Sequence, residues 1–158
     1  PFTSTWHWIV KSIQYSILLW KDRDWDQAFI LMLLKYKISR TRKCISKNNL
    51  VVSAPMQAAQ MLHVERLIDK YLENDFCSEE FDAHEERWGK LSMESVPAKD
   101  KPGFNYVTFT RSKVKTEDDK YQEEKEYKAL LEKSRKAEED CWNEIFDSMK
   151  EYMRGWWD

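Results

Sequence analysis

Cationic and aromatic side chains lie together on one predicted helix, residues 24–47, where they could bind a phosphorylated ligand. The candidate ligand-binding residues are Trp25, Tyr36, Lys37, Arg40 and Lys43. Guanidinium and ammonium groups bind phosphate oxygens, and aromatic rings stack on bases. The expected chemistry is therefore recognition of an anionic nucleotide, or of a single nucleic-acid strand in a groove, without a covalent step.

The same residues have an alternative interpretation as ordinary helix packing. Several of them continue a single helical stripe, which consists of Trp25, Phe29, Met32, Tyr36, Arg40 and Lys43. Stripes at this spacing usually face a core. In that case the aromatic rings are buried, and the basic residues pair with acidic residues of the final helix. The sequence leaves both interpretations open.

Few other residues have the spacing that metal binding or catalysis requires. Asp22, Asp24 and Asp26 are two residues apart, so a helix would not present them on one face, and only a turn could gather them around a metal. The three histidines are single, and Cys44 has no indicated base beside it. Three glycines are too few for a phosphate-binding loop. No catalytic residue, metal site or cofactor is predicted, and an enzyme is the less favoured class.

Composition is typical of long amphipathic helices in a single domain, residues 1–158. The chain has only 3 Gly and 4 Pro, and 34% of its residues are charged. The net charge of -2 gives a weak overall field, so nucleic-acid binding stays open. Three widely spaced cysteines and no visible signal-peptide pattern lead us to expect a cytoplasmic location. Residues 2–20 are apolar but interrupted by Lys11 and Gln14, so no membrane role is expected.

Capping and breaking residues divide the chain into four or five helices. These are expected over residues 4–21, 24–47, 53–73, 78–91 and 116–154. Residues 92–115 contain prolines and a glycine that exclude a helix, and residues 104–110 are rich in strand formers. That segment could be a strand, a hairpin arm or an extended loop. The predicted fold class is mainly α: a helical bundle with a long C-terminal helix and an irregular or short-strand segment near 95–115.

The last predicted helix has an apolar end and a charged beginning. Thr116 followed by Asp119 resembles a capping box, and Gly155 is the expected terminator. An apolar stripe expected to face the core comprises Trp142, Phe146, Met149, Met153 and Trp156. At about 1.5 Å per residue this helix is long for a compact bundle. We therefore expect either a break near Ser134 or a projecting first half that a partner covers, for example in a homo-oligomer through this helix.

Three segments resemble parts of small uncharacterised proteins encoded by tailed bacteriophages. They are residues 25–43, the Glu-Glu-Arg-Trp-Gly run at 85–89, and the ending Arg-Gly-Trp-Trp-Asp at 154–158. The resemblance covers about half of the chain and includes no catalytic motif, so it assigns no functional residue. It implies an accessory protein made in the bacterial cytoplasm. Many such proteins counter host defences by binding a host effector or by sequestering a nucleotide immune signal.

These observations favour a non-enzymatic binding protein, encoded by a phage, that counters a bacterial defence by sequestering a nucleotide signal. Its expected partners are an anionic nucleotide or a host defence protein. Two alternatives belong to other classes. The chain could be a virion, assembly or other structural interaction protein, or a metal-dependent enzyme that processes nucleotides with its aspartate cluster.

Overall fold

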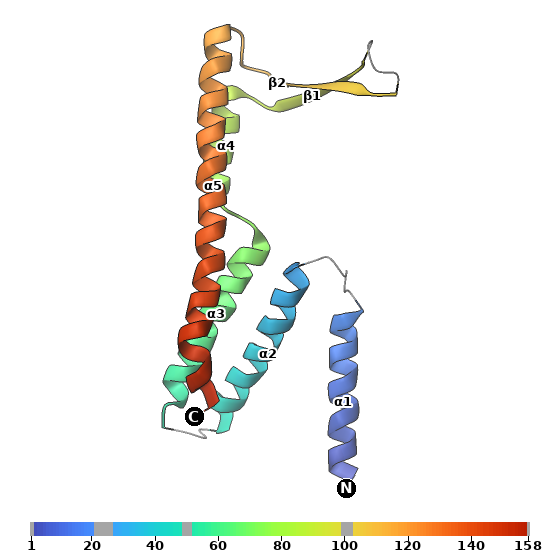
Figure 1. Ribbon diagram of the computed structural model, residues 1–158, viewed down its shortest axis with the longest axis vertical. Helices are drawn as coiled ribbons and strands as arrows, with labels where there is room; N and C mark the ends of the chain where they lie inside the picture. The colour runs from blue at the N-terminus through green and yellow to red at the C-terminus, as the bar shows by residue number, and fades with distance from the viewer. Residues whose placement is uncertain (1, 21–26, 49–51, 99–102, 158) are drawn as a thin grey trace. The chain divides into compact units, whose positions relative to one another are not determined.

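The fold is mainly α, as the composition predicts. The computed structural model describes residues 2–20, 27–48, 52–98 and 103–157 (Figure 1). The elements in chain order are α1 (Phe2–Leu19), α2 (Gln27–Asn48), α3 (Ala54–Glu73), α4 (Ser78–Trp88), β1 (Leu91–Pro97), β2 (Asn105–Arg111), α5 (Glu117–Tyr152) and the 3-10 helix η1 (Met153–Trp157). Among the described residues, no helix combines the length and the apolar character that crossing a membrane requires.

Two compact units make up the chain. The first contains residues 1–73 and 141–158, and the second contains residues 74–140. Helix α5 contributes to both units, because the boundary at Cys141 lies within it. The second unit is therefore inserted in the sequence of the first. That both units belong to one domain stays a prediction.

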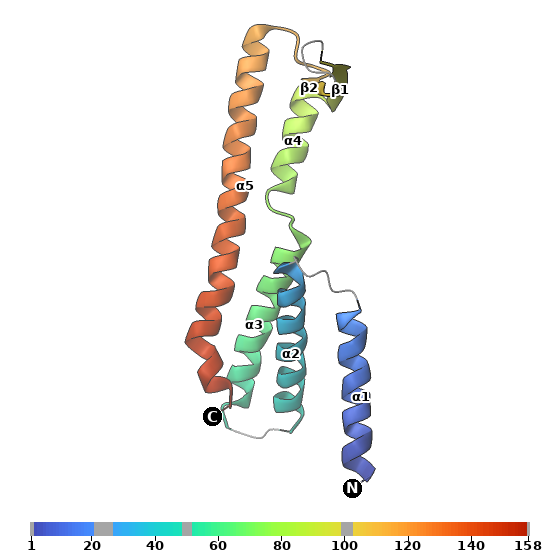
Figure 2. The same ribbon diagram turned by 45° about the vertical axis from the view of Figure 1, so that its right-hand side comes forward.

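The core of the first unit is built on α2 and α3, which run side by side (Figures 1 and 2). From α2, Leu31, Ile38 and Ile45 are buried at a seven-residue spacing, which keeps them on one helix face. From α3, Met61 and Ile68 are fully buried. Met56, in the first turn of α3, is 60% exposed and lies outside this core.

The apolar stripe predicted at the end of α5 is shifted by one residue. The buried residues of this stretch are Cys141, Ile145 and Ser148, whereas Phe146 and Met153 are each 42% exposed. Trp156 is buried as predicted. The α-helix ends at Tyr152, so Gly155 does not terminate it but lies inside η1, where its carbonyl accepts a hydrogen bond of 2.7 Å from the Gln57 amide.

In the second unit, α4 lies along the first half of α5 (Figures 1 and 2). The rings of Phe81 and Tyr127 meet edge to face at 6.2 Å. Helix α5 continues through Ser134, so the predicted break is absent there. The Ser134 hydroxyl instead donates a hydrogen bond of 3.1 Å to the carbonyl of Phe76. The first half of α5 is thus covered on one face by its own chain.

The predicted capping box at the start of α5 is confirmed. The Asp119 amide donates to the Thr116 hydroxyl at 3.1 Å, and the Thr116 amide donates to the Asp119 carboxylate at 2.9 Å. The hydrogen bond with Thr116, helped by the backbone amides of Lys115 and Thr116, lowers the pKa of the Asp119 carboxyl. These reciprocal bonds satisfy backbone donors that an α-helix leaves unpaired at its first turn.

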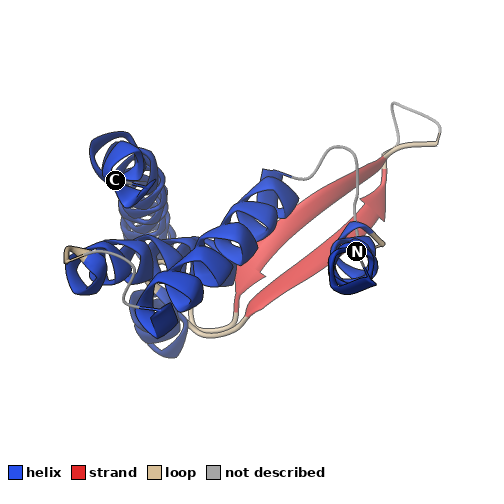
Figure 3. Cartoon of the chain, turned by 90° about the horizontal axis from the view of Figure 1, so that it is seen from below, coloured by secondary structure: helices blue, strands red, loops and turns tan. Residues whose placement is uncertain are grey.

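The segment between α4 and α5 is an antiparallel hairpin. Strands β1 and β2 pair from Leu91 opposite Arg111 to Pro97 opposite Asn105 (Figure 3). The strand formers at 104–110 are thus a hairpin arm, one of the predicted possibilities. Strand β1 was not predicted, and α4 ends at Trp88 rather than at residue 91. The helix ends there because Gly89 takes a φ of 84° and its amide bonds back to the Glu85 carbonyl.

Replacing Gly89 with alanine is expected to destabilise the second unit by about 1–3 kcal/mol, because its backbone conformation is essentially restricted to glycine. An added Cβ would also lie 2.2 Å from the Ser112 hydroxyl and 3.0 Å from the Lys113 amide nitrogen. Urea unfolding followed by circular dichroism measures the change. Gly155→Ala is the matched control, since a Cβ at Gly155 meets nothing within 4 Å. Equal midpoints for Gly89→Ala and the unaltered chain would contradict this account.

Candidate functional site

The basic half of α2 has one face whose charges are neutralised by α3. Lys35 forms an ion pair with Asp69, and Arg42 donates two hydrogen bonds, of 2.7 and 3.1 Å, to Glu65. The hydrogen bond with Glu65 raises the pKa of Arg42. The packing interpretation of the sequence expected acidic partners on the final helix. For these two cations the partners lie on α3 instead.

A second face of α2 meets α1 through neutral groups. One Arg40 nitrogen, Nη1, donates to the side-chain oxygen of Gln14 at 2.6 Å and to the Tyr36 hydroxyl at 3.0 Å. The Arg40 guanidinium carbon lies 5.5 Å from the centre of the Tyr36 ring, and Tyr15 meets that ring edge to face, also at 5.5 Å. Hydrogen bonds and an aromatic contact therefore orient the positive charge of Arg40, and no carboxylate of a described residue pairs with it.

The five predicted ligand-binding residues have different positions. Tyr36 and Arg40 are brought together, while Lys37 and Lys43 are exposed and have no hydrogen-bond or ion-pair partner among the described residues. Lys43 lies two helical turns after Tyr36 and so shares its side of α2, whereas Lys37 is about 100° around the helix. Trp25 lies outside the described residues. Gln14 was not predicted, because the sequence gives no signal that α1 would approach this part of α2.

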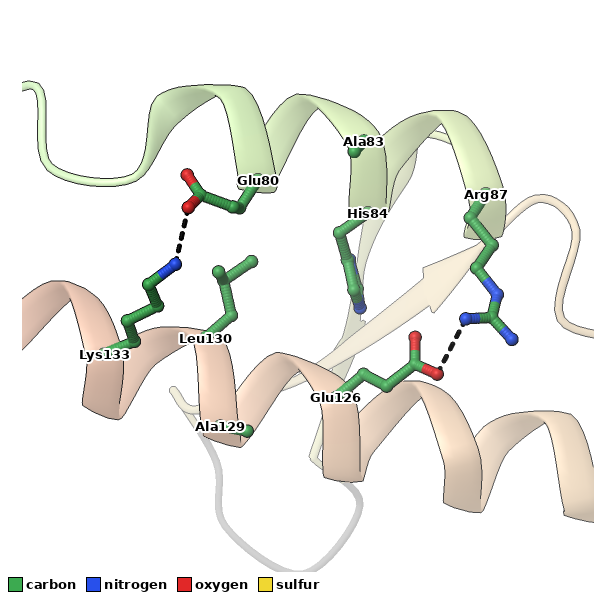
Figure 4. Close-up of a pocket in the computed structure, with 8 residues that line it drawn as sticks. All are labelled: Glu80, Ala83, His84, Arg87, Glu126, Ala129, Leu130 and Lys133. Atoms are coloured by element: carbon green, nitrogen blue, oxygen red, sulfur yellow. Dashed lines mark hydrogen bonds and ion pairs between the residues drawn. The ribbon is translucent and has the colours of Figure 1, made fainter.

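Polar side chains also converge in a cleft between α4 and α5 in the second unit (Figure 4). Its volume is about 420 Å³. Ion pairs cross it at two positions, Glu80 with Lys133 at 2.6 Å and Arg87 with Glu126 at 2.9 Å. Leu130 and two alanines supply apolar surface between them. Since each cation faces its own carboxylate, the cleft offers no net charge to an ionic ligand.

A buried ionic network lies beside this cleft. Arg111 of β2 donates to the Glu123 carboxylate and, at 3.1 Å, to the Gly89 carbonyl. The His84 ring is buried, and its Nε2 lies 3.8 Å from a Glu123 oxygen without a hydrogen-bond partner among the residues that the structure describes. Trp88 donates its indole N–H to Glu126 at 2.8 Å. These contacts connect α4, β2 and α5, which indicates a structural role. The sequence reasoning missed Glu123 and Arg111, which belong to different elements.

No group of three or more His, Cys, Asp or Glu side chains within the described ranges is placed to hold a metal ion. The aspartate cluster at residues 22, 24 and 26 lies outside those ranges. The three cysteines, which are all described, form no disulfide, and burial raises the pKa of the Cys141 thiol.

Comparison with known proteins provides no functional assignment to transfer. No protein-family model, no curated protein and no solved structure matches the chain.

Proposed function

We propose that this chain is a non-enzymatic binding protein whose ligand is an anion that carries phosphate, with Arg40 as the main contact. One observation supports this choice. Arg40 is held by the neutral Gln14 and Tyr36, whereas Lys35 and Arg42 on the same helix are each paired with a carboxylate. A cation that is held in position, but that no carboxylate in the described part of the chain neutralises, is suited to an external anion.

The neighbouring residues extend the proposed site toward a nucleotide. A guanidinium can donate two parallel hydrogen bonds to one phosphate, and Lys43 adds a second cation two turns from Tyr36. Tyr36 offers a ring that a base can stack on. Lys37 lies around the helix from Tyr36, at the margin of the proposed site. Trp25 is included in the proposed site on the basis of the sequence alone. The ligand class that fits these groups is a nucleotide with more than one phosphate.

The biological role that we propose follows from the resemblance to phage accessory proteins. Such a protein, made in the bacterial cytoplasm, would sequester a nucleotide immune signal and so counter a host defence. The ligand would be held and released without chemical change. A nucleotide-processing enzyme, which is the competing proposal, would return an altered ligand and would lose activity with a chelator.

A structural interaction protein is a second candidate, and an exposed apolar face formed by α1 and the following Trp20 favours it. The residues of this face are spaced by three and four and are each at least 46% exposed: Trp6, Ile9, Ile13, Ile17 and Trp20. Contiguous apolar surface of this kind marks interaction sites. An assembly protein of this type would co-purify with particles or with a host protein and would bind no nucleotide.

Removing both cations, Arg40→Ala with Lys43→Ala, is expected to weaken nucleotide binding at least about 100-fold, because two charge-assisted contacts are lost. Isothermal titration calorimetry with a linear and a cyclic dinucleotide as probes measures the affinity. Helicity should be unchanged, since neither residue is buried. The matched control is Lys125→Ala with Lys128→Ala, which removes the same charge from exposed positions of α5.

Two results would contradict the proposal. One is a melting temperature of the unaltered chain that no nucleotide raises, because a ligand at 100 times its dissociation constant stabilises the folded state by about 2.7 kcal/mol. The other is an equal loss of affinity in the control variant. Mass spectrometry of the ligand released after denaturation then separates sequestration from catalysis.

A further inference from the structure

The hairpin β1–β2 carries an apolar face that its own unit leaves open. Met93 stands opposite Phe109 and Ser95 opposite Val107 in the register, so these side chains share one face. Met93 is 65% exposed, Val107 48% and Phe109 61%. An isolated two-stranded sheet is marginally stable in water, and further strands or a covering surface are needed to stabilise it.

The hydrogen-bond ladder between β1 and β2 determines which backbone N–H and C=O groups point outward, away from the partner strand. The Ser112 amide donates to the Lys90 carbonyl, and the Ala98 amide donates to the Phe104 carbonyl, one bond beyond each end of the hairpin. In an antiparallel ladder, pairs that exchange backbone hydrogen bonds alternate with pairs that do not. Both of these end bonds join even-numbered residues, so the even-numbered residues of β1 and β2 form the hydrogen bonds within the hairpin. The N–H and C=O groups of Val107 and Phe109 therefore point away from β1. Those of Met93 and Ser95 point away from β2.

The two outer edges differ in how well they are protected. Strand β1 carries Glu94 at its centre and Pro97 at its end, and charge and proline both oppose the addition of another strand. Strand β2 has neither a charged residue nor a proline from Asn105 to Thr110. An unprotected edge with apolar side chains is a template for strand addition.

We propose that the β2 edge pairs with β2 of a second copy of this chain, antiparallel and symmetric about Thr108. In this register Val107 stands opposite Phe109 and Asn105 opposite Arg111, each pair occurring twice. The outward N–H and C=O groups of Val107 and Phe109 bond to one another, as the ladder requires. No like charges are opposed, because the single charged residue of β2, Arg111, faces a neutral amide. The product is a four-stranded sheet with one continuous apolar face.

The surroundings of β2 leave room for the added strand. A groove of about 470 Å³ lies beside residues 108–111, and its opposite wall is one face of α5 that includes Lys120 and Tyr127. In the proposed register, Asn105 of the second copy stands opposite Arg111, which lines this groove. The Arg111 carbonyl already accepts a hydrogen bond from the Val114 amide, so the pairing between the copies is centred on Val107 and Phe109.

Proline substitutions test the edge without breaking the hairpin. Val107→Pro removes an outward N–H that makes no bond to β1, so β1–β2 pairing is retained while the dimer loses two hydrogen bonds. Ser95→Pro makes the same change at the opposite residue of the β1 edge. Sedimentation equilibrium of the full chain should show a dimer for the unaltered protein and for Ser95→Pro. For Val107→Pro the dissociation constant should rise at least about tenfold.

Amide hydrogen exchange provides an independent readout on the unaltered chain. The amides of Val107 and Phe109 should be protected at high protein concentration and exchange faster on dilution, while those of Met93 and Ser95 exchange rapidly throughout. A monomeric unaltered chain would overturn the proposal. So would equal dissociation of both proline variants, which would indicate a general effect of hairpin strain, or protection of the β1 amides in place of the β2 amides.

Discussion

Substituting Glu123 with leucine should destabilise the protein by about 3–5 kcal/mol, because it leaves the guanidinium of Arg111 buried without its anion. The Arg111 and Glu123 side chains are only 7% and 14% exposed. Water therefore cannot replace the lost carboxylate at low cost. His84 would also lose the carboxylate 3.8 Å from its ring nitrogen. Urea unfolding followed by circular dichroism measures the difference in free energy.

Two further variants separate the loss of charge pairing from a loss of packing. Glu124→Leu changes the neighbouring carboxylate, which is exposed, and should alter stability by no more than about 0.5 kcal/mol. The double variant Glu123→Leu with Arg111→Met removes both charges. It should recover part of the lost free energy of unfolding, because no buried ion is then left without a partner. A double variant that is less stable than Glu123→Leu alone would argue against the buried-charge explanation.

Replacing Ile145 with alanine should destabilise the first unit by about 2–5 kcal/mol, which is the usual range for emptying a buried aliphatic site. The Ile145 side chain is completely buried, and the surrounding α2–α3 core is formed by similarly enclosed residues. The cavity left behind adds to the lost transfer free energy, because a close-packed interior relaxes only partly.

The adjacent residue is the natural control for this prediction. Phe146 is 42% exposed, and its ring lies 4.7 Å from that of Trp142, near the surface. Phe146→Ala should therefore cost clearly less than Ile145→Ala although it removes the larger side chain. If Phe146→Ala lowers the free energy of unfolding more than Ile145→Ala does, α5 packs through Phe146, as the sequence predicted.

Signals that act over a few residues explain why most helices could be predicted. The Thr116–Asp119 capping box operates within one turn, so the start of α5 follows from sequence alone. The packing face of α5, in contrast, does not follow from the sequence alone. Two stripes one residue apart, one through Ile145 and one through Phe146, both contain apolar side chains. The choice between them depends on the surface that α3 presents, and this is a tertiary effect.

The candidate site shows the same division between local and tertiary information. Tyr36 and Arg40 are four residues apart on one helix, so their contact could be predicted. Gln14 approaches them from another helix, and no short-range pattern indicates that approach. Strand β1 was missed for a related reason. Its sequence, with two serines and a glutamate among apolar residues, becomes a strand by pairing with β2.

The insertion of one unit within the other affects how the chain can fold. Residues 74–140 separate the two segments that build the first unit, and closing an open loop of that length has an entropy cost that grows with the logarithm of its length. The hydrogen bond from Ser134 to Phe76 joins positions near the two ends of the insert. Once the insert has folded, that loop is already closed. Its folding therefore assists the first unit as a cross-link would, by reducing the entropy that the rest of the chain still has to lose.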